Sequence, residues 1–385
     1  MSFLIRLSEF QFKYAKEILI FIIVLTLFLA FGITKISMQS NLDEMMPQDL
    51  EVYQISDKIK DNFGGQDVSL ILLKIEGSEK NGVYDIRDPR VLEFLVDLQD
   101  SLKNENLIES IQSIGMGFSK DSIPKSLKES QEIFNNIPEY SPFFNKDYSA
   151  TMVMISSDLG GGEEKIREIE NLINEKISEI SNPENVKIYI TGTPQIRSMI
   201  LDLLASDAIF TLVIASIVIF LLLNIMERSL NKAILIFTPL VLGIIWTLGT
   251  MGWLGIQLSI ATVGIGAMIL GLGVEYGVFI VSRYKEERIK KSSKESLQIA
   301  VKEVGSSILG SGTTTIVGFL ALTISIMPVL RDLGLSLAIG IAFSLFAAVF
   351  VNPALIVLEE RLSEWRFIRN INKTNTKIKQ YNLEK

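Results

Sequence analysis

The sequence of 385 residues contains no cysteine and no histidine. Without cysteine there is no disulfide framework and no thiolate metal site. Without histidine the chain lacks the commonest metal ligand, the usual proton shuttle and the base of a Ser-His hydrolase. A phosphate-binding G-x-x-x-x-G-K-[ST] loop is also absent, which argues against a nucleotide-driven pump. We therefore expect no enzyme activity, no metal and no cofactor; any work would draw on an ion gradient, of protons or of Na⁺.

The balance of apolar and charged residues indicates a membrane protein with a large aqueous part. Hydrophobic residues make up 48% of the chain and charged residues 21%, and the mean hydropathy is +0.35. Such a chain is too apolar for an ordinary soluble enzyme and too charged to lie entirely in hydrocarbon. We expect an α-helical membrane bundle and a separate aqueous domain.

Apolar runs divide the chain. Residues 1–17 carry Arg6, Lys13 and Lys16 between apolar residues and predict an amphipathic helix on the cytoplasmic membrane surface. Residues 18–35 follow as a first transmembrane helix; alone they could be a signal peptide, but the downstream spans favour an uncleaved helix. Five further runs of about 20 residues or more can each cross ~30 Å of hydrocarbon. They fill residues 207–358, at roughly 208–226, 233–254, 259–281, 305–327 and 333–358.

The distribution of basic residues predicts the orientation of these six helices. Seven Lys and Arg residues lie from Arg283 to Lys302 and seven more in the tail 359–385, whereas the connection 255–258 has none. Basic loops stay in the cytoplasm. Both termini are therefore expected in the cytoplasm of a multi-pass cell-membrane protein, and residues 36–206 outside.

Residues 36–206 predict an acidic α+β domain. They hold 30 Asp and Glu against 16 Lys and Arg, so no nucleic-acid surface is expected. Their pattern reads strand, helix, strand, strand, helix, strand, the βαββαβ order of a ferredoxin-like unit. Gly160, Gly161 and Gly162 free the backbone before the second helix, and residues 115–148 form an insertion. The expected elements are 67–75, 89–103, 107–114, 150–156, 163–180 and 186–191.

Aromatic residues gather in the insertion. They are Phe134, Tyr140, Phe143, Phe144 and Tyr148. They fit a small satellite core, since aromatic residues often only pack together. They also fit a mobile flap that touches a hydrophobic substrate.

A lone acid in the fourth span is the strongest candidate for chemistry. Glu275 has no charged residue within seven positions. Acids within a span are costly and rarely lack a task, although a protonated structural Glu is the alternative. The glycines at 271, 273 and 277 remove bulk around it, which allows close helix packing.

Hydroxyl residues of the fifth span fall at a similar depth. Ser307, Ser311 and Thr314 recur at i, i+4 and i+7 on one helix face, and Thr313 widens this stripe. Glu275 lies ~12 Å and Thr314 ~16 Å from the cytoplasmic boundary at 1.5 Å rise per residue. The hydroxyls could meet the acid, or they could only bond back to their own helix.

Several motifs resemble the resistance–nodulation–division (RND) superfamily, in particular its MMPL branch, related to hopanoid exporters and sterol-sensing domains. They are WTLGTMGWLGIQLS from 246, GLGVEYGVFIVSRYKEE from 271, TTTIVGFLAL from 313, LRDLGLSLAIGI from 330 and TGTPQIRSMILDLL from 191. The family has Asp-Tyr where this chain has Glu275-Tyr276. The resemblance implies a proton relay of Glu275, Tyr276 and the hydroxyl stripe.

The resemblance also implies partners. Its familiar exporters carry two copies of this unit, whereas this chain has one, so a homodimer is expected, with Glu275 of one subunit near Tyr276 of the other. Membrane lipids or another hydrophobic molecule would be the exported substrate. The alternatives are a sterol-sensing-like lipid receptor, a SecDF-like accessory to protein export, or a membrane-anchored scaffold.

Overall fold

The computed structural model describes residues 2–41, 44–63, 67–77, 82–157, 159 and 163–362. Gly160 to Gly162 and the basic tail beyond 362 lie outside these ranges. The chain divides into two compact units, Gln39–Leu203 and the combination of Met1–Met38 with Leu204–Lys385. Helix α7 (Thr193–Glu227) is continuous across the boundary between them.

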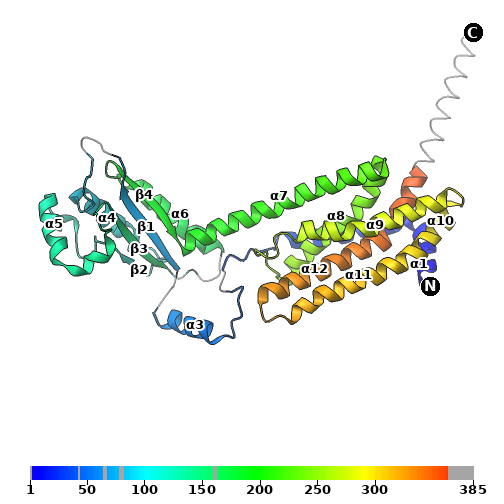
Figure 1. Ribbon diagram of the computed structural model, residues 1–385, viewed down its shortest axis with the longest axis horizontal. Coiled ribbons are helices and arrows are strands. Elements are labelled where there is room, and N and C mark those ends of the chain that lie inside the picture. The colour runs from blue at the N-terminus through cyan, green and yellow to red at the C-terminus, as the bar shows by residue number, and fades with distance from the viewer. Residues whose placement is uncertain are drawn as a thin grey trace, which may run out of the picture. The chain divides into compact units, whose positions relative to one another are not determined.

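The unit Gln39–Leu203 is built on a four-stranded antiparallel sheet in the order β2-β3-β1-β4 (Figure 1). Strand β1 (Asp67–Ile75) alternates buried and exposed residues, because its odd-numbered apolar side chains face the core. It pairs with β3 (Ala150–Ser157) on one side and β4 (Val186–Gly192) on the other. Edge strand β2 (Ser110–Gln112) is shorter than the predicted 107–114, since it has only β3 as a partner.

Two amphipathic helices complete the core of this unit. In α4 (Pro89–Leu102) the Asp88 side chain accepts a hydrogen bond from the Arg90 amide, and Pro89 suits the first turn. Helix α6 (Glu163–Glu179) buries Ile166, Ile169 and Ile173 at helical spacing and contacts α4. The predicted order of strands and helices is therefore observed. The remaining helical segments of the unit are α3 (Glu51–Phe63), η1 (Lys120–Ser122), α5 (Leu127–Asn136) and η2 (Pro138–Phe143).

Within its described residues, the other unit contains six helices that are long and apolar enough to cross a membrane, as predicted. Several bounds differ from the prediction, and two of the helix starts have a local explanation. Helix α7 begins well before residue 208, because nothing after Pro194 breaks the helix, and α9 begins after Ser259, where the Thr262 hydroxyl accepts from the Ser259 amide at 2.7 Å. The spans are Ala15–Ile33, Thr193–Glu227, Leu230–Leu254, Ile265–Arg288, Ser293–Ile324 and Pro328–Leu362.

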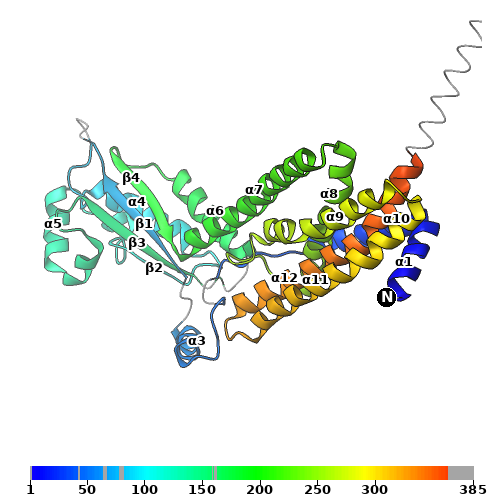
Figure 2. The same cartoon turned by 45° about the vertical axis from the view of Figure 1, so that its right-hand side comes forward.

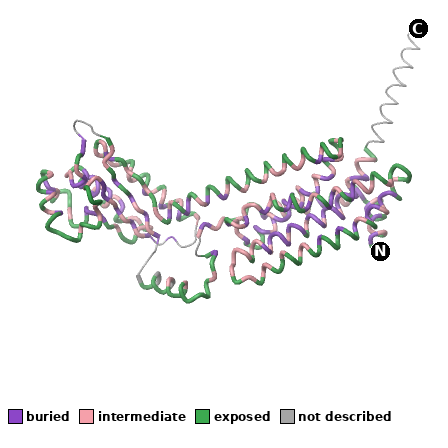
Figure 3. The backbone as a smooth tube through the Cα atoms, in the orientation of Figure 1, coloured by how far each residue is buried: buried purple, intermediate pink, exposed green. Residues whose placement is uncertain are grey.

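Three helices form the centre of this bundle: α8 (Leu230–Leu254), α9 (Ile265–Arg288) and α12 (Pro328–Phe346). Within an apolar stretch of 18 residues in each of these spans, 44% to 67% of the residues are buried, against 6% to 11% in the spans that contain α2 (Ala15–Ile33), α7 and α11 (Gly305–Leu320) (Figure 3). Helices α11 and α12 lie side by side in both views (Figures 1 and 2). Helix α11 therefore keeps a broad uncovered face.

A short helix and two π-helical turns complete the bundle. The amphipathic helix α1 (Ser2–Lys13) contacts α10 (Ser293–Ile299) and the π turn Ala300–Val304. A second π turn, Ala347–Val351, precedes Pro353. Proline has no N–H, so the carbonyl four residues earlier lacks its usual donor. That carbonyl belongs to Val349, and Gln11 Nε2 donates to it at 2.7 Å. A 3₁₀ turn, Ala321–Ile324, ends the fifth span.

Candidate functional site

Glu275 lies on the outward face of α9. Residues 271, 275 and 279, four positions apart, are exposed, whereas Gly273, Tyr276 and Gly277 are buried. The helix therefore turns its small residues into the bundle and its single intramembrane acid out of it. A carboxylate on such a face must meet water, another chain or lipid, and lipid is the costliest of the three.

Two of the three predicted glycines allow close packing inside the bundle. A Cβ on Gly273 would lie 3.0 Å from Ser344 Cβ of α12, and one on Gly277 would lie 3.2 Å from the carbonyl oxygen of Ile236 in α8. At Gly271 an added Cβ would meet nothing within 4 Å. Gly273 and Gly277 thus hold α9 against its neighbours, while Gly271 leaves space beside Glu275.

Tyr276 points the other way from Glu275. Its side chain is 1% exposed, and its phenol lies beside the hydroxyl of Thr315 in α11. This contact joins α9 to α11 at the depth where the sequence places the acid and the hydroxyl stripe. In this conformation the phenol is inside its own subunit, so Glu275 of the partner subunit could reach it only after this face rearranges.

The hydroxyl stripe of α11 is uncovered. Ser307, Ser311, Thr313 and Thr314 are all exposed. The Thr313 hydroxyl donates to the Leu309 carbonyl at 2.6 Å, and the Thr314 hydroxyl to the Ser311 carbonyl at 2.7 Å. Bonding back to the helix uses the hydroxyl proton and leaves oxygen lone pairs free to accept. The stripe can therefore receive a proton donor from outside the chain.

Two buried polar residues near the acid were not among the sequence candidates. Asn352 is fully buried and donates through Nδ2 to the Gly277 carbonyl at 3.5 Å. Among the described residues, neither Asn352 Oδ1 nor the neighbouring Ser344 Oγ has a hydrogen-bond partner. The sequence signal for Asn352 was the Asn-Pro pair within the last apolar run. Such a pair is equally typical of a helix kink, so it did not single out a functional residue. The α9–α12 contact thus contains polar groups that could respond to a charge change at Glu275.

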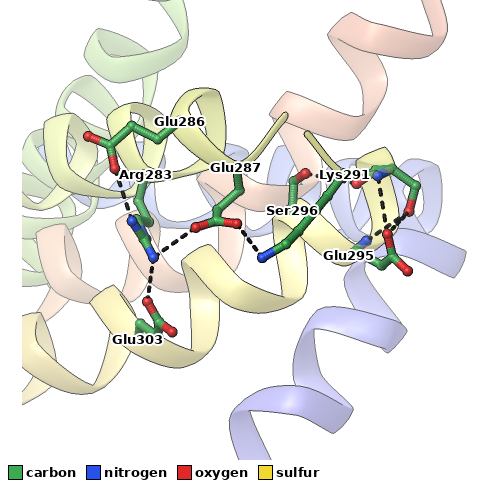
Figure 4. A network of polar contacts seen from close by, with 8 residues as sticks. Arg283, Glu286, Glu287, Lys291, Glu295, Ser296 and Glu303 are labelled. Atoms are coloured by element: carbon green, nitrogen blue, oxygen red, sulfur yellow. Dashed lines mark hydrogen bonds and ion pairs between the residues drawn. The ribbon is translucent and has the colours of Figure 1, made fainter. Parts of the chain in front are cut away.

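An ion network ties the end of α9 to the segment before α11 (Figure 4). One Arg283 nitrogen lies 2.8 Å from both Glu287 and Glu303, and the other lies 3.0 Å from Glu286. Lys291 contacts Glu287 at 2.6 Å. Movement of α9 would therefore be transmitted to α11 through these pairs as well as through Tyr276.

An apolar cavity of about 260 Å³ lies within the bundle unit, away from this network. Residues of α2, α7, α8 and the start of α9 line it, including Ile33, Leu212, Leu248, Leu258 and Gly266. Such a lining accepts an apolar chain and offers few polar groups to fix its orientation.

The aromatic residues of the insertion pack as a small core. The ring centroid of Phe134 lies 5.2 Å from that of Tyr140 and 5.3 Å from that of Phe144, while Phe143 is only partly buried. The insertion is anchored through Arg87, which lies 2.6 Å from Asp85 and donates to Asn135 of α5 at 3.1 Å.

The electrostatics of this anchor favour its ionised form. Burial alone would raise the pKa of Asp85, but hydrogen bonds from Arg87 and Gln131 outweigh it and lower the pKa. The geometry therefore holds the insertion in place, and a role of its aromatic residues as a substrate flap stays a prediction. Among the residues that the structure describes, no group of three or more acidic residues could hold a metal ion.

The fold and the site define a polytopic membrane protein with an acid on the exposed face of a spanning helix. Comparison with known proteins agrees: residues 44–380 match the model of the MMPL family, and the chain belongs to that family. It is 36% identical over 363 residues to the membrane protein MJ1562 of Methanocaldococcus jannaschii, covering 92% of this chain and 94% of that protein.

Several relatives carry functional names, and two of these longer proteins illustrate them. The siderophore exporter MmpL5 of Mycobacterium tuberculosis is 25% identical over 229 residues, which cover 57% of this chain and 23% of the exporter. The sulfolipid-1 exporter MmpL8 of the same species is 35% identical over 95 residues, which cover 24% of this chain and 9% of the exporter. The match thus spans less than a quarter of each exporter's length.

Proposed function

We propose that the chain is a secondary transporter that exports a lipid or another hydrophobic molecule, driven by protons that pass Glu275. The observation that carries the proposal is the placement of this acid: it lies within a span on an exposed face of α9, and the hydroxyl stripe of α11 is uncovered as well. Family membership and the exporter names of two relatives support the same class of function.

Protonation would act through the cost of a buried charge. An ionised Glu275 is strongly disfavoured in hydrocarbon, whereas its neutral form is tolerated. Proton binding would therefore let α9 settle against its neighbours, and proton release would move it toward water. The Tyr276–Thr315 contact and the Arg283 network give that movement a route to α11.

The working unit in this proposal is a homodimer with both termini in the cytoplasm. A single copy of the unit leaves Glu275 and the α11 hydroxyls uncovered, and two-fold association would enclose them. The strand order β2-β3-β1-β4 with two helices supports a ferredoxin-like porter domain, placed outside the cell to handle substrate.

The test uses purified protein in liposomes with a pH-sensitive dye inside. An imposed pH gradient should drive proton flux in the wild type with a candidate lipid present, and Glu275→Gln should abolish it. Asp207→Asn is the control, because it removes an exposed acid from another spanning helix, α7, outside the Arg283 network. Proton flux that persists in Glu275→Gln would contradict the proton relay. Transport that depends on a Na⁺ gradient instead would show that Na⁺ is the coupling ion.

A lipid receptor is the second candidate, favoured by the apolar cavity beside α2, α7 and α8. A receptor would bind a lipid there without moving protons. Equal lipid binding by wild type and Glu275→Gln, with no flux in either under any candidate lipid, would support the receptor and contradict the transporter.

A further inference from the structure

A second cavity, of about 310 Å³, lies where α8 begins, where α9 ends and where the last span, Pro328–Leu362, ends. This is the end of the bundle that carries the basic loop after α9. One part of the lining is apolar and the other is charged, so it could hold an amphiphile. The apolar residues are Leu235, Val281, Ile289 and Ile356, and the charged residues are Lys232, Lys285, Arg288, Glu359 and Glu360.

Two lysines of this cavity stand side by side. Lys232 of α8 and Lys285 of α9 both line the cavity, and the charge of Lys285 acts on Lys232. Each ammonium group only donates, so the pair gains no hydrogen bond from this approach and the charges repel. Among the residues that the structure describes, no carboxylate forms an ion pair with Lys232. An anion bound in the cavity would relieve the repulsion between the two groups and pair with Lys232.

The nearby acids leave Lys232 without an ion pair of its own. Glu360 is already engaged by Arg288 at 2.6 Å and by the hydroxyls of Tyr284 and Ser293. Glu227 forms a loose ion pair with Lys285 at 3.8 Å, and Glu227 and Glu359 attract Lys232 without pairing with it.

We propose that this cavity binds an anionic phospholipid, with its phosphate between Lys232 and Lys285 and the start of an acyl chain along the apolar wall. Basic pockets between helices at a membrane surface recognise such headgroups. The apolar wall favours a lipid over a free phosphate ion, which would gain nothing from Leu235 or Ile356. The lipid would bridge α8 and α9 near the end of α12.

This site is separate from Glu275 and does not depend on transport. It requires only that the helices lie in a membrane. Its partner is the lipid of the adjacent leaflet, bound as a structural or regulatory ligand, whereas the proposed export substrate is handled by the outer domain.

The test is native mass spectrometry of the full chain in detergent with added phosphatidylglycerol or phosphatidylcholine. The wild type should retain phosphatidylglycerol in preference to phosphatidylcholine. Removing each lysine should weaken phosphatidylglycerol binding on the order of fivefold, and Lys232→Gln with Lys285→Gln about thirtyfold. Phosphatidylcholine binding should not change.

Two further variants keep the outcome clear. Lys290→Gln with Lys302→Gln removes the same charge from the same end of the bundle outside the cavity and should bind like the wild type. Lys232→Arg with Lys285→Arg keeps both charges and should retain binding if the glutamine variant simply fails to fold. Equal loss in the control pair, equal affinity for both lipids, or full displacement by glycerol phosphate at the lipid's concentration would each overturn the proposal.

Discussion

At the scale of single residues, the bundle depends on side chains that complete backbone hydrogen bonds. Gln11 is fully buried and its amide serves the Val349 carbonyl that Pro353 leaves without a donor. Composition predicted α1 only as a surface helix, because hydropathy cannot show that one of its polar residues reaches a carbonyl 338 positions away. The bond makes α1 part of the bundle.

Gln11→Leu should therefore destabilise the protein by about 1–3 kcal/mol, the usual cost of leaving a buried carbonyl unsatisfied. Thermal unfolding in detergent, followed by circular dichroism, measures the effect. Gln298→Leu is the control, since that amide contacts Glu9 at an exposed position and its loss should change little. Equal stability of the two variants would show that Gln11 does not support the Val349 carbonyl.

A second residue-scale prediction concerns pH and the sheet. Hydrogen bonds from Lys187 and Tyr189 lower the pKa of Glu76 from 4.5 to about 2. A lowered pKa in the folded state contributes stability above the unfolded value, and this contribution is lost as pH falls from about 4.5 toward 2. The unfolding temperature of wild type should exceed that of Glu76→Gln at pH 6, and the gap should close by pH 2.

Glu132→Gln is the matched control for this titration, because Glu132 forms no ion pair among the described residues. The unfolding temperature of Glu132→Gln should stay close to that of the wild type at both pH 6 and pH 2. A gap for Glu76→Gln that is constant from pH 6 to pH 2 would contradict the role of the Lys187 and Tyr189 hydrogen bonds.

At the scale of elements, α2 and α8 touch backbone to backbone. A Cβ on Gly249 would lie 2.0 Å from the Leu29 carbonyl oxygen, and one on Gly252 would lie 1.8 Å from that of Gly32. In lipid, helices gain little hydrophobic free energy by associating. Small residues at such a contact allow the close van der Waals packing that holds the helices together instead. Trp246 adds a hydrogen bond to Thr26 at 2.9 Å across the same contact.

Gly249→Ala should force these helices apart and cost about 1–3 kcal/mol, as other overpacked sites do. Gly264→Ala is the matched change at a position where the nearest atom would be Met268 Cε at 3.9 Å, and it should be close to neutral. Unfolding temperatures in the same detergent compare them; a stable Gly249→Ala would mean that α2 and α8 can separate freely.

The elements were largely predictable, and the reasons for success and failure are physical. Long apolar runs and the alternation in residues 67–75 are local patterns, so six spans and the βαββαβ order follow from them. Which face of each helix is buried depends on neighbours far away in sequence. Glu275 could be recognised as an unusual acid, but its outward direction, the burial of Tyr276 and the position of Asn352 became clear only from packing.

At the scale of the whole molecule, the open question is what covers α11. This helix presents small and hydroxyl residues outward, and Gly310 meets nothing within 4 Å. Exposed small residues on a span allow a second helix to approach closely. We infer that another copy of the chain packs here and encloses Glu275, as the proposed homodimer requires.

The chain has no cysteine, so one introduced thiol reports this contact without background. Ser311→Cys should form a disulfide-linked dimer on mild oxidation in membranes. Adding Gly310→Phe should suppress the crosslink, because a bulky ring fills the space that the second helix needs. Adding Val24→Phe instead should leave the crosslink yield unchanged, because Val24 is 61% exposed on a different helix, α2. An unchanged crosslink yield with Gly310→Phe, or no crosslink at all with Ser311→Cys, would place the subunit contact elsewhere on the bundle and leave Glu275 facing lipid or water.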